Sequence, residues 1–269
     1  MKIITSLVLC FVSTLLFAQK KNAKPVYVLF VGNSYIFFNS LPQICTGIAA
    51  SGGDVLITES STVGGYSMKQ HFADSNTINK IISGTPDYQK RKRRSWDYVV
   101  LQDQSQYPSN PIGEVEQNVF PYARYLDSTI HKYDPLAKTV FYSTWGRKNG
   151  DSARGIKWPP VRTYKGMDSL LQMRYMMMAE KNNGMVAPVS AVWRVLREKY
   201  PEIDLYDVDN SHPSEAGSYA AAYCFYTVFF KKDPTLAKFD YTLSSSDALN
   251  IRRVVKNVVY NNLGKWLIK

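Results

Sequence analysis

Cysteine is scarce in this 269-residue chain, which holds only Cys10, Cys45 and Cys224. So few cysteines exclude a disulfide-dense scaffold and leave no CxxC motif for a metal or redox site. Cys10 falls in an apolar N-terminal run, whereas Cys45 and Cys224 lie in apolar helical patterns. We expect Cys45 and Cys224 to be buried small hydrophobic residues, with one bridge between them as the alternative.

Long apolar runs are also missing, apart from residues 3–17 near the start. Lys2 precedes this run and Ala18 follows it, so residues 1–18 are predicted to be a cleaved secretory signal peptide. An uncleaved membrane anchor is the alternative. We expect the mature chain to be exported, periplasmic or secreted, with no integral membrane segment after cleavage. Residues 19–269 show no linker or repeat and are expected to form a single domain.

Acidic residues are outnumbered, because 22 Asp and Glu stand against 33 Lys and Arg and give a formal net charge of +11. Such an excess is typical of proteins that bind nucleic acid. Export argues against that partner, and five of the positive charges fall in the run KRKRR at residues 90–94. We expect this run to be a solvated loop, with an anionic polysaccharide or a membrane surface as the alternative partner. The sequence carries no indication of an oligomeric state.

Short apolar runs alternate with helical patterns through the rest of the chain. Runs this short and nearly continuous are typical of parallel strands that are covered on both faces. The helical patterns include one that ends at Gly52 and Gly53, and one that Asp247 opens and Gly264 closes. The alternation predicts an α/β fold with a five-stranded parallel sheet between two helical layers. The predicted strands are residues 26–31, 55–58, 98–102, 139–142 and 185–189.

Two segments interrupt this alternation, and we expect both to be surface insertions. They are residues 85–94 and residues 146–160. The second follows the end of a predicted strand directly. Because ligands of open α/β sheets bind beyond the carboxyl ends of the strands, we expect this segment to border any site there.

Histidine occurs only three times, which makes the search for a general base short. His212 lies in DVDNSHPSEAG, three residues after Asp209. A histidine base needs a carboxylate on its other ring nitrogen, and a tight turn would let Asp209 supply it. Pro213 favours such a turn, because it disfavours helical geometry at His212 and suits the start of a helix. The alternative is that both side chains only cap a helix and satisfy loop amides.

Ser34 follows the first predicted strand in the sequence VGNSY. Gly32 permits a sharp turn and a close approach there. A serine at this edge of a parallel sheet is placed as a nucleophile, although an ordinary helix-capping serine is the alternative. The second glycine of a G-x-S-x-G elbow is missing, which argues against an α/β-hydrolase.

Taken in order, these residues resemble the SGNH hydrolases, also called GDSL-type esterases. That family carries a serine block after strand one, an oxyanion glycine after strand two, an oxyanion asparagine after strand three, and a C-terminal D-x-x-H. Here the first block is GNS, with Asn33 where the family more often has Asp, and Gly65 in VGGY best matches the second. The resemblance implies a three-layer α/β/α, flavodoxin-like fold.

The third block departs from the family pattern. The sequence VLQDQSQ offers Gln104 and Gln106 where Gly-x-Asn would stand. A glutamine presents the same amide NH2 group as asparagine on a longer stem, so either residue can serve an oxyanion hole. The chain is similar to a subgroup of secreted SGNH proteins that carry GNS, GGY, VLQxQSQ and DxSHP together.

The resemblance implies acyl transfer through a covalent intermediate. Ser34 would attack an ester carbonyl, His212 would move the proton, and Asp209 would orient His212. The oxyanion would be held by the amides of Ser34 and Gly65 and by a glutamine side chain. No metal or other cofactor is implied, and HExxH and P-loop patterns are absent from the sequence.

Aromatic residues near the strand ends are the candidate substrate contacts. Tyr35 follows the nucleophile and could wall an acyl pocket, while Trp145 and Trp158 could stack on a sugar ring. Each could equally pack inside the protein, and His71 is expected on a helix surface. A small-molecule or carbohydrate ester, most of all an acetylated carbohydrate, is the expected substrate. A lipase or lysophospholipase, or a non-catalytic carbohydrate-binding protein, are the alternatives.

Overall fold

The computed structural model describes residues 23–85 and 96–269 of the chain. The predicted signal peptide at residues 1–18, the basic run at residues 90–94 and Cys10 lie outside these residues. Within the described parts, no helix has both the length and the apolar character needed to cross a membrane.

The described residues contain a five-stranded sheet with every neighbouring pair parallel, which confirms the predicted fold class. The strand order is β2-β1-β3-β4-β5, so β1 lies inside the sheet and the chain crosses over it between β2 and β3. Such a crossover creates the point where parallel-sheet proteins bind ligands. The strands are β1 (Val26–Gly32), β2 (Leu56–Thr62), β3 (Tyr98–Leu101), β4 (Lys138–Tyr142) and β5 (Met185–Ala187).

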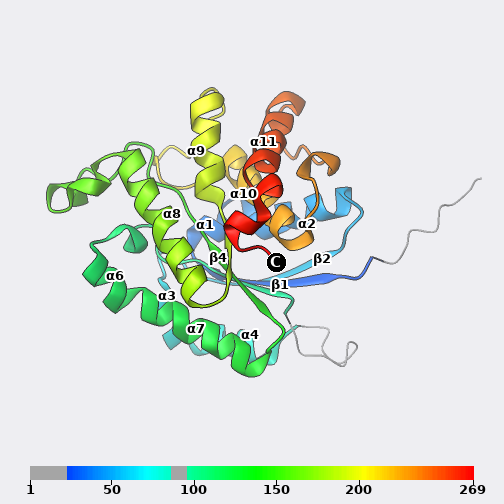
Figure 1. Ribbon diagram of the computed structural model, residues 1–269. Helices are drawn as coiled ribbons and strands as arrows, with labels where there is room; N and C mark the ends of the chain where they lie inside the picture. Colours follow the sequence, from blue (N-terminus) through cyan, green and yellow to red (C-terminus); the bar gives the residue numbers. More distant parts are fainter. Residues whose placement is uncertain (1–22, 86–95) are drawn as a thin grey trace, which may run out of the picture.

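Helices cover both faces of the sheet (Figure 1). One layer holds α2 (Leu41–Ser51), α9 (Val189–Lys199), α10 (Glu215–Phe230) and α11 (Ser245–Val258). The other holds α3 (Met68–Ala73), α4 (Ser75–Ser83), α6 (Ile112–Asn118), α7 (Phe120–Tyr133) and α8 (Tyr164–Lys181). A single turn, α1 (Ser34–Phe37), links β1 to α2 through a short 3₁₀ segment.

The central helix α10 is apolar around nearly its whole circumference, because it packs between the sheet and its neighbours α2, α9 and α11. Its Phe225 lies edge-on against Phe30 of β1, with ring centres 5.3 Å apart. Cys45 of α2 and Cys224 of α10 are both buried and free, so no bridge joins them. They are small hydrophobic residues of the core, as the first of the two alternatives predicted.

Several predicted boundaries are wrong by one to several residues. The third strand ends at Leu101, and Val189 belongs to α9 and not to β5. The last helix begins after Ser244, whose side chain accepts from the amide of Asp247. It ends at Val258, and Gly264 lies in the following 3₁₀ segment. Helix ends depend on such caps, which a pattern of apolar residues does not reveal.

The strand register brings three loops to one edge of the sheet. Val31 pairs with Ser61 of β2 and with Leu101 of β3, so the loops after β1, β2 and β3 leave the sheet side by side. The residues predicted to form the nucleophile and oxyanion blocks therefore meet in space.

Candidate active site

Ser34 is the first residue of α1, directly beyond the end of β1. Asn33 caps this turn, because its side-chain oxygen accepts from the amide of Tyr35 at 3.3 Å. Gly32 is needed for a close approach: a Cβ there would lie 2.4 Å from the Gln102 side-chain oxygen and 2.7 Å from Ile36. The chain can thus turn tightly and leave the Ser34 hydroxyl at the sheet edge.

His212 is presented by a turn that Asp209 organises. One carboxylate oxygen of Asp209 accepts from the amides of Ser211 and His212, both at 2.9 Å. Asn210 adopts a left-handed conformation with φ of 60°, which asparagine tolerates well. The turn ends at Pro213, ahead of α10. The segment is therefore a tight turn, as the sequence predicted, and the imidazole and the carboxylate face each other.

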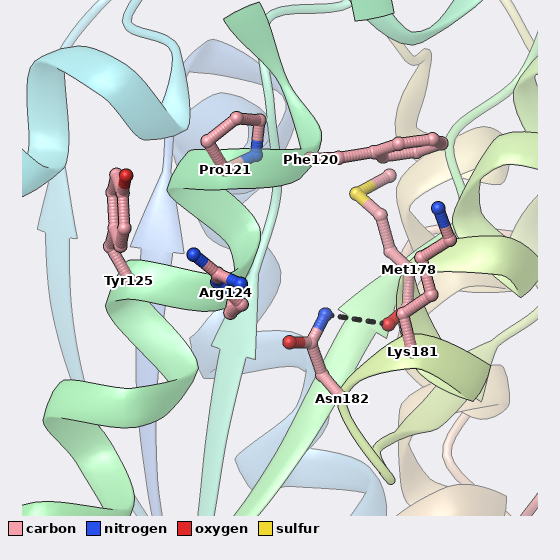
Figure 2. Close-up of a pocket in the computed structure, with 7 residues that line it drawn as sticks. All are labelled: Phe120, Pro121, Arg124, Tyr125, Met178, Lys181 and Asn182. Atoms are coloured by element: carbon pink, nitrogen blue, oxygen red, sulfur yellow. Dashed lines mark hydrogen bonds between the residues drawn. The ribbon is translucent and has the colours of Figure 1, made fainter. Parts of the chain in front are cut away.

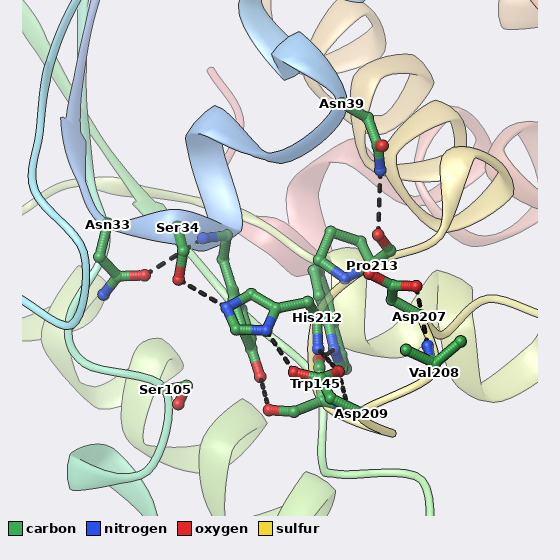
Figure 3. A network of polar contacts seen from close by, with 12 residues as sticks. Asn33, Ser34, Asn39, Ser105, Trp145, Asp207, Val208, Asp209, His212 and Pro213 are labelled. Carbon is green, nitrogen blue, oxygen red and sulfur yellow. Dashed lines mark hydrogen bonds and ion pairs between the residues drawn. The ribbon is translucent and has the colours of Figure 1, made fainter.

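The three side chains form one hydrogen-bonded line (Figure 3). The Nε2 atom of His212 lies 2.8 Å from the Ser34 hydroxyl, and its Nδ1 atom lies 2.5 Å from the second Asp209 oxygen. A carboxylate only accepts, so Nδ1 carries the proton and Nε2 is free to take one from Ser34. Burial raises the pKa of Asp209, but hydrogen bonds from His212 and the two amides outweigh it, and the net pKa is lowered.

Two aromatic rings hold the imidazole. Phe38 stacks on His212 with ring centres 4.2 Å apart, and Tyr35 meets it edge-on at 5.5 Å. A ring face is attracted to a cation, so the Phe38 ring would stabilise a protonated His212 ring. The Tyr35 hydroxyl lies 2.8 Å from Ser211, and the Asn39 amide donates to the Pro213 carbonyl at 2.9 Å. These contacts fasten the histidine turn to the nucleophile turn.

A pocket of about 330 Å³ opens over this line of side chains. Gly65 lies on its wall with φ of 73°, a conformation that favours glycine. The lining residues are Asn33, Ser34, Tyr35, Gly65, Gln104, Ser105, Arg147, Asp209, Ser211 and His212.

The two candidate glutamines differ in position. Gln104 lines the pocket, and its side-chain oxygen accepts from the Gln106 amide at 2.7 Å, which directs its NH2 group elsewhere. The Gln106 side chain instead donates to Asp151 at 2.5 Å and is not part of the pocket wall. Of the two glutamines, only Gln104 lines the pocket together with Ser34, so it stays the candidate that the pocket geometry favours.

Two solved structures resemble this arrangement of strands and helices. A DUF4886 family protein from Bacteroides uniformis superposes with a TM-score of 0.68 at 14% identity, over 87% of this chain and 94% of that one. A protein described as a candidate SGNH hydrolase from Slackia heliotrinireducens superposes with a TM-score of 0.57 at 21% identity, over 76% of this chain and 98% of its own. The chain has the SGNH hydrolase fold. No protein-family model matches the sequence, and no curated protein matches it.

In this SGNH fold, Asn33 and Gln102 connect the three loops of the site. The Asn33 NH2 group donates to the carbonyls of Tyr66 at 2.8 Å and Asp103 at 3.2 Å, in the loops after β2 and β3. The fully buried Gln102 accepts from the Asn33 amide at 2.9 Å and donates to its side-chain oxygen at 3.0 Å. Asn33 thus ties the loops after β2 and β3 to the nucleophile turn. The sequence analysis gave Gln102 no role, although a polar residue at the end of an apolar strand is the signal that could have identified it.

The side chain of Asp103 joins the loops after β2 and β3 by hydrogen bonds. One of its carboxyl oxygens accepts from the amides of Met68 at 3.0 Å and Gln104 at 2.7 Å. The other oxygen is buried and has no hydrogen-bond partner within the described residues. Burial raises the pKa of Asp103 to about 7, against the two amides, which lower it. The carboxyl group that joins the loops after β2 and β3 therefore has a pKa near neutral pH.

This titration predicts a pH-dependent stability. In the unfolded chain Asp103 loses its proton near pH 3.8, but in the folded protein it keeps the proton until about pH 7. Between these values the folded state binds more protons, so the free energy of unfolding falls as the pH rises, by at most about 1.4 kcal/mol per pH unit. Urea unfolding from pH 4 to pH 8 measures this fall.

The matched variant is Asp103→Asn, which keeps the accepting oxygen and cannot ionise. We expect its free energy of unfolding to change less with pH than that of the wild type over the same window. Two parallel curves would show that Asp103 does not titrate in the folded protein.

Trp145 does not contact the pocket, contrary to its predicted role with substrate. Its side chain is 0% exposed and stacks between Tyr35 and Trp193, with ring centres 4.7 Å and 3.7 Å away. Its indole donates to the Ser211 carbonyl at 3.1 Å. Trp145 is a support beneath Tyr35 and the histidine turn, and it offers no face to a sugar.

Trp158 is likewise an anchor of its loop. Its indole donates to the carbonyl of Ser109 at 2.9 Å, and its ring packs against a small cluster around Val161. It is not part of the pocket wall. Of the three predicted substrate contacts, only Tyr35 lines the pocket.

His71 is fully buried, so its predicted position on a helix surface is wrong. Its ring nitrogens lie 2.9 Å from the Thr77 hydroxyl and 2.8 Å from the Gly32 carbonyl. Burial lowers its pKa, although the bond to Gly32 acts in the opposite direction. The ring thus supports the carbonyl group at the end of β1.

A second hollow of about 280 Å³ lies between α7 and α8 (Figure 2). Phe120, Arg124 and Tyr125 of α7 line it together with Met178 and Lys181 of α8. Its wall offers no serine, histidine or carboxylate, so it lacks the groups that acyl transfer requires. In the described parts of the chain, no three His, Cys, Asp or Glu side chains gather as a metal site.

Proposed function

We propose that this protein is an exported serine esterase that hydrolyses carboxylic esters, above all acetyl esters on carbohydrate. The observation that carries the proposal is the hydrogen-bonded line from Ser34 through His212 to Asp209. A nucleophile, a base on its hydroxyl and a carboxylate on the base are the arrangement that acyl transfer needs. The fold shared with a candidate SGNH hydrolase supports the same reaction class.

The proposed reaction has two halves. The Ser34 oxygen attacks the ester carbonyl carbon while His212 Nε2 takes the hydroxyl proton, and the carbonyl oxygen becomes an oxyanion. When the intermediate collapses, His212 returns the proton to the leaving alcohol and the acyl group stays on Ser34. A water molecule then repeats the steps, releasing the acid and free Ser34.

Three donors are proposed for the oxyanion. Ser34 begins a helical turn, where an amide N–H has no partner within the helix. The Gly65 amide and the Gln104 side chain lie on the same pocket wall. Preorganised donors of this kind stabilise the transition state by about 3–4 kcal/mol each.

The character of the pocket favours a short acyl group. Apart from Tyr35 and Gly65, its lining residues are polar or charged, and its volume is about 330 Å³. A long acyl chain would find little apolar surface to bury there, whereas an acetyl group and a polar alcohol would fit. The lipase alternative is therefore the second candidate. A purely binding role is third, because the three side chains are aligned for proton transfer.

Covalent labelling combined with an ester series tests the proposal. The protein without residues 1–18 is incubated with p-nitrophenyl acetate, butyrate and octanoate, and separately with diethyl p-nitrophenyl phosphate. We expect the acetate to be hydrolysed fastest and peptide mapping to find the phosphoryl group on Ser34. Octanoate as the best substrate would favour the lipase alternative. Hydrolysis of no ester, or labelling at another residue, would contradict the esterase proposal.

A further inference from the structure

Arg147 brings a positive charge into the candidate active site. It lies in the loop after β4 and lines the same pocket as Ser34 and His212. About a third of its side chain is exposed to solvent. None of the proposed steps of ester hydrolysis uses this group.

The charge of Arg147 is poorly matched by its neighbours. Its nearest carboxylate, Asp151, lies 3.5 Å from one terminal nitrogen, at the limit of a hydrogen bond. The same Asp151 oxygen accepts from Gln106 at the much shorter distance of 2.5 Å, and the other accepts from the Arg154 amide at 3.0 Å. Within the described residues, the buried Nε atom of Arg147 has no hydrogen-bond partner at all.

The other carboxylate of the pocket, Asp209, forms no ion pair with Arg147 within the described residues. Both oxygens of Asp209 are occupied, by the His212 ring and by the amides of Ser211 and His212. Burial lowers the pKa of Arg154 and the nearby charge of Arg147 lowers it further, while Asp151 and Glu114 raise it. Asp151 therefore interacts with both guanidinium groups, and its charge is not matched to Arg147 alone.

A guanidinium with free donors matches a carboxylate in shape and charge, because two parallel N–H groups can meet its two oxygens. We propose that Arg147 binds a carboxylate carried by the ester substrate, so that acetylated acidic sugars are preferred over neutral ones. The net charge of +11 acts in the same direction, since it attracts anionic polymers to the protein. This inference rests on the proposed esterase activity of the same pocket.

The test compares two sugars that differ in one group. Acetylated methyl glucuronide and acetylated methyl glucoside, with the acetyl group on the same hydroxyl, have either a carboxylate or a hydroxymethyl group on the ring. We expect the wild type to hydrolyse the glucuronide with a kcat/KM about 10-fold or more above that of the glucoside. In Arg147→Met this ratio should fall close to one, mainly through KM for the glucuronide.

Two further variants test whether the preference depends on this particular side chain and on the shape of its guanidinium group. Lys148→Met removes a positive charge from the next residue, whose ammonium pairs with Asp204 at 2.8 Å outside the pocket, and the ratio should persist. Arg147→Lys keeps the charge without the two-pronged geometry, and the ratio should fall between those of wild type and Arg147→Met.

A wild-type ratio near one, an unchanged ratio in Arg147→Met, or an equal loss in Lys148→Met would overturn the proposal. If p-nitrophenyl acetate is still hydrolysed in a Ser34-dependent way, such a result rejects the carboxylate site and leaves the esterase function standing. If no ester is hydrolysed, the function itself fails and the carboxylate site falls with it.

Discussion

Replacing Ser34 with alanine is expected to lower kcat/KM for p-nitrophenyl acetate by at least about 10⁴-fold. The substitution removes the oxygen that would carry the acyl group, and His212 then has no hydroxyl to deprotonate. The remaining oxyanion donors can still polarise the carbonyl, which leaves a small residual rate above that of water. Initial rates of wild type and variant at matched concentration measure the loss.

The fold should survive the Ser34→Ala change, because the hydroxyl contacts the His212 ring at the pocket surface and fills no core space. A single hydrogen bond contributes about 1 kcal/mol, so the thermal unfolding midpoint should shift only slightly. Ser105→Ala is the matched control, since Ser105 lines the same pocket but contacts Gln104 and not His212. Its activity should fall less than about tenfold. A Ser34→Ala protein with more than a tenth of wild-type activity would exclude Ser34 as the nucleophile.

Changing Asp209 to asparagine is expected to lower kcat by about 10⁴-fold while the fold persists. The retained side-chain oxygen can still accept from the amides of Ser211 and His212, which keeps the turn intact. The new NH2 group would then face His212 Nδ1 and force the ring proton onto Nε2. In that tautomer Nε2 cannot accept the proton of Ser34.

Asp207→Asn provides the comparison for Asp209→Asn. Asp207 lies in the same turn, and its side chain accepts from the Val208 amide at 2.8 Å, away from the imidazole. Its kcat should stay within about threefold of the wild-type value. Comparable rates in the two asparagine variants would mean that the carboxylate on His212 has no catalytic part.

The fold was predictable because its determinants are local. Most strands are short apolar runs that join helices whose apolar stripe can be read from spacing. The exception is β2, whose sequence LITESST was predicted only over its apolar start. The meeting of Ser34 and His212 followed only from a family resemblance, since 178 positions separate them. The pairing of Asp209 with His212 was easier to predict, because the two residues are three positions apart and Pro213 marks the turn.

The surroundings of the site were harder to predict, because they depend on contacts between distant segments. Trp145 is hidden only because Tyr35 and Trp193, far apart in the chain, close over its two faces. The choice between Gln104 and Gln106 depends on Asp151, which draws one of them away from the pocket. Which side chain reaches the pocket depends on the conformation of the loops, and loop conformation leaves no periodic pattern in the sequence.

The pair formed by Asn33 and Gln102 limits which sequences this site can adopt. An aspartate at position 33, the residue more common in the family that this chain resembles, would turn its side-chain donors into acceptors. Its oxygens would then face the carbonyl oxygens of Tyr66 and Asp103, and like partial charges would repel. An aspartate there would require those loops to follow another path. Asn33 is therefore tied to the path of these two loops, because a side-chain donor at position 33 is needed to satisfy both carbonyls.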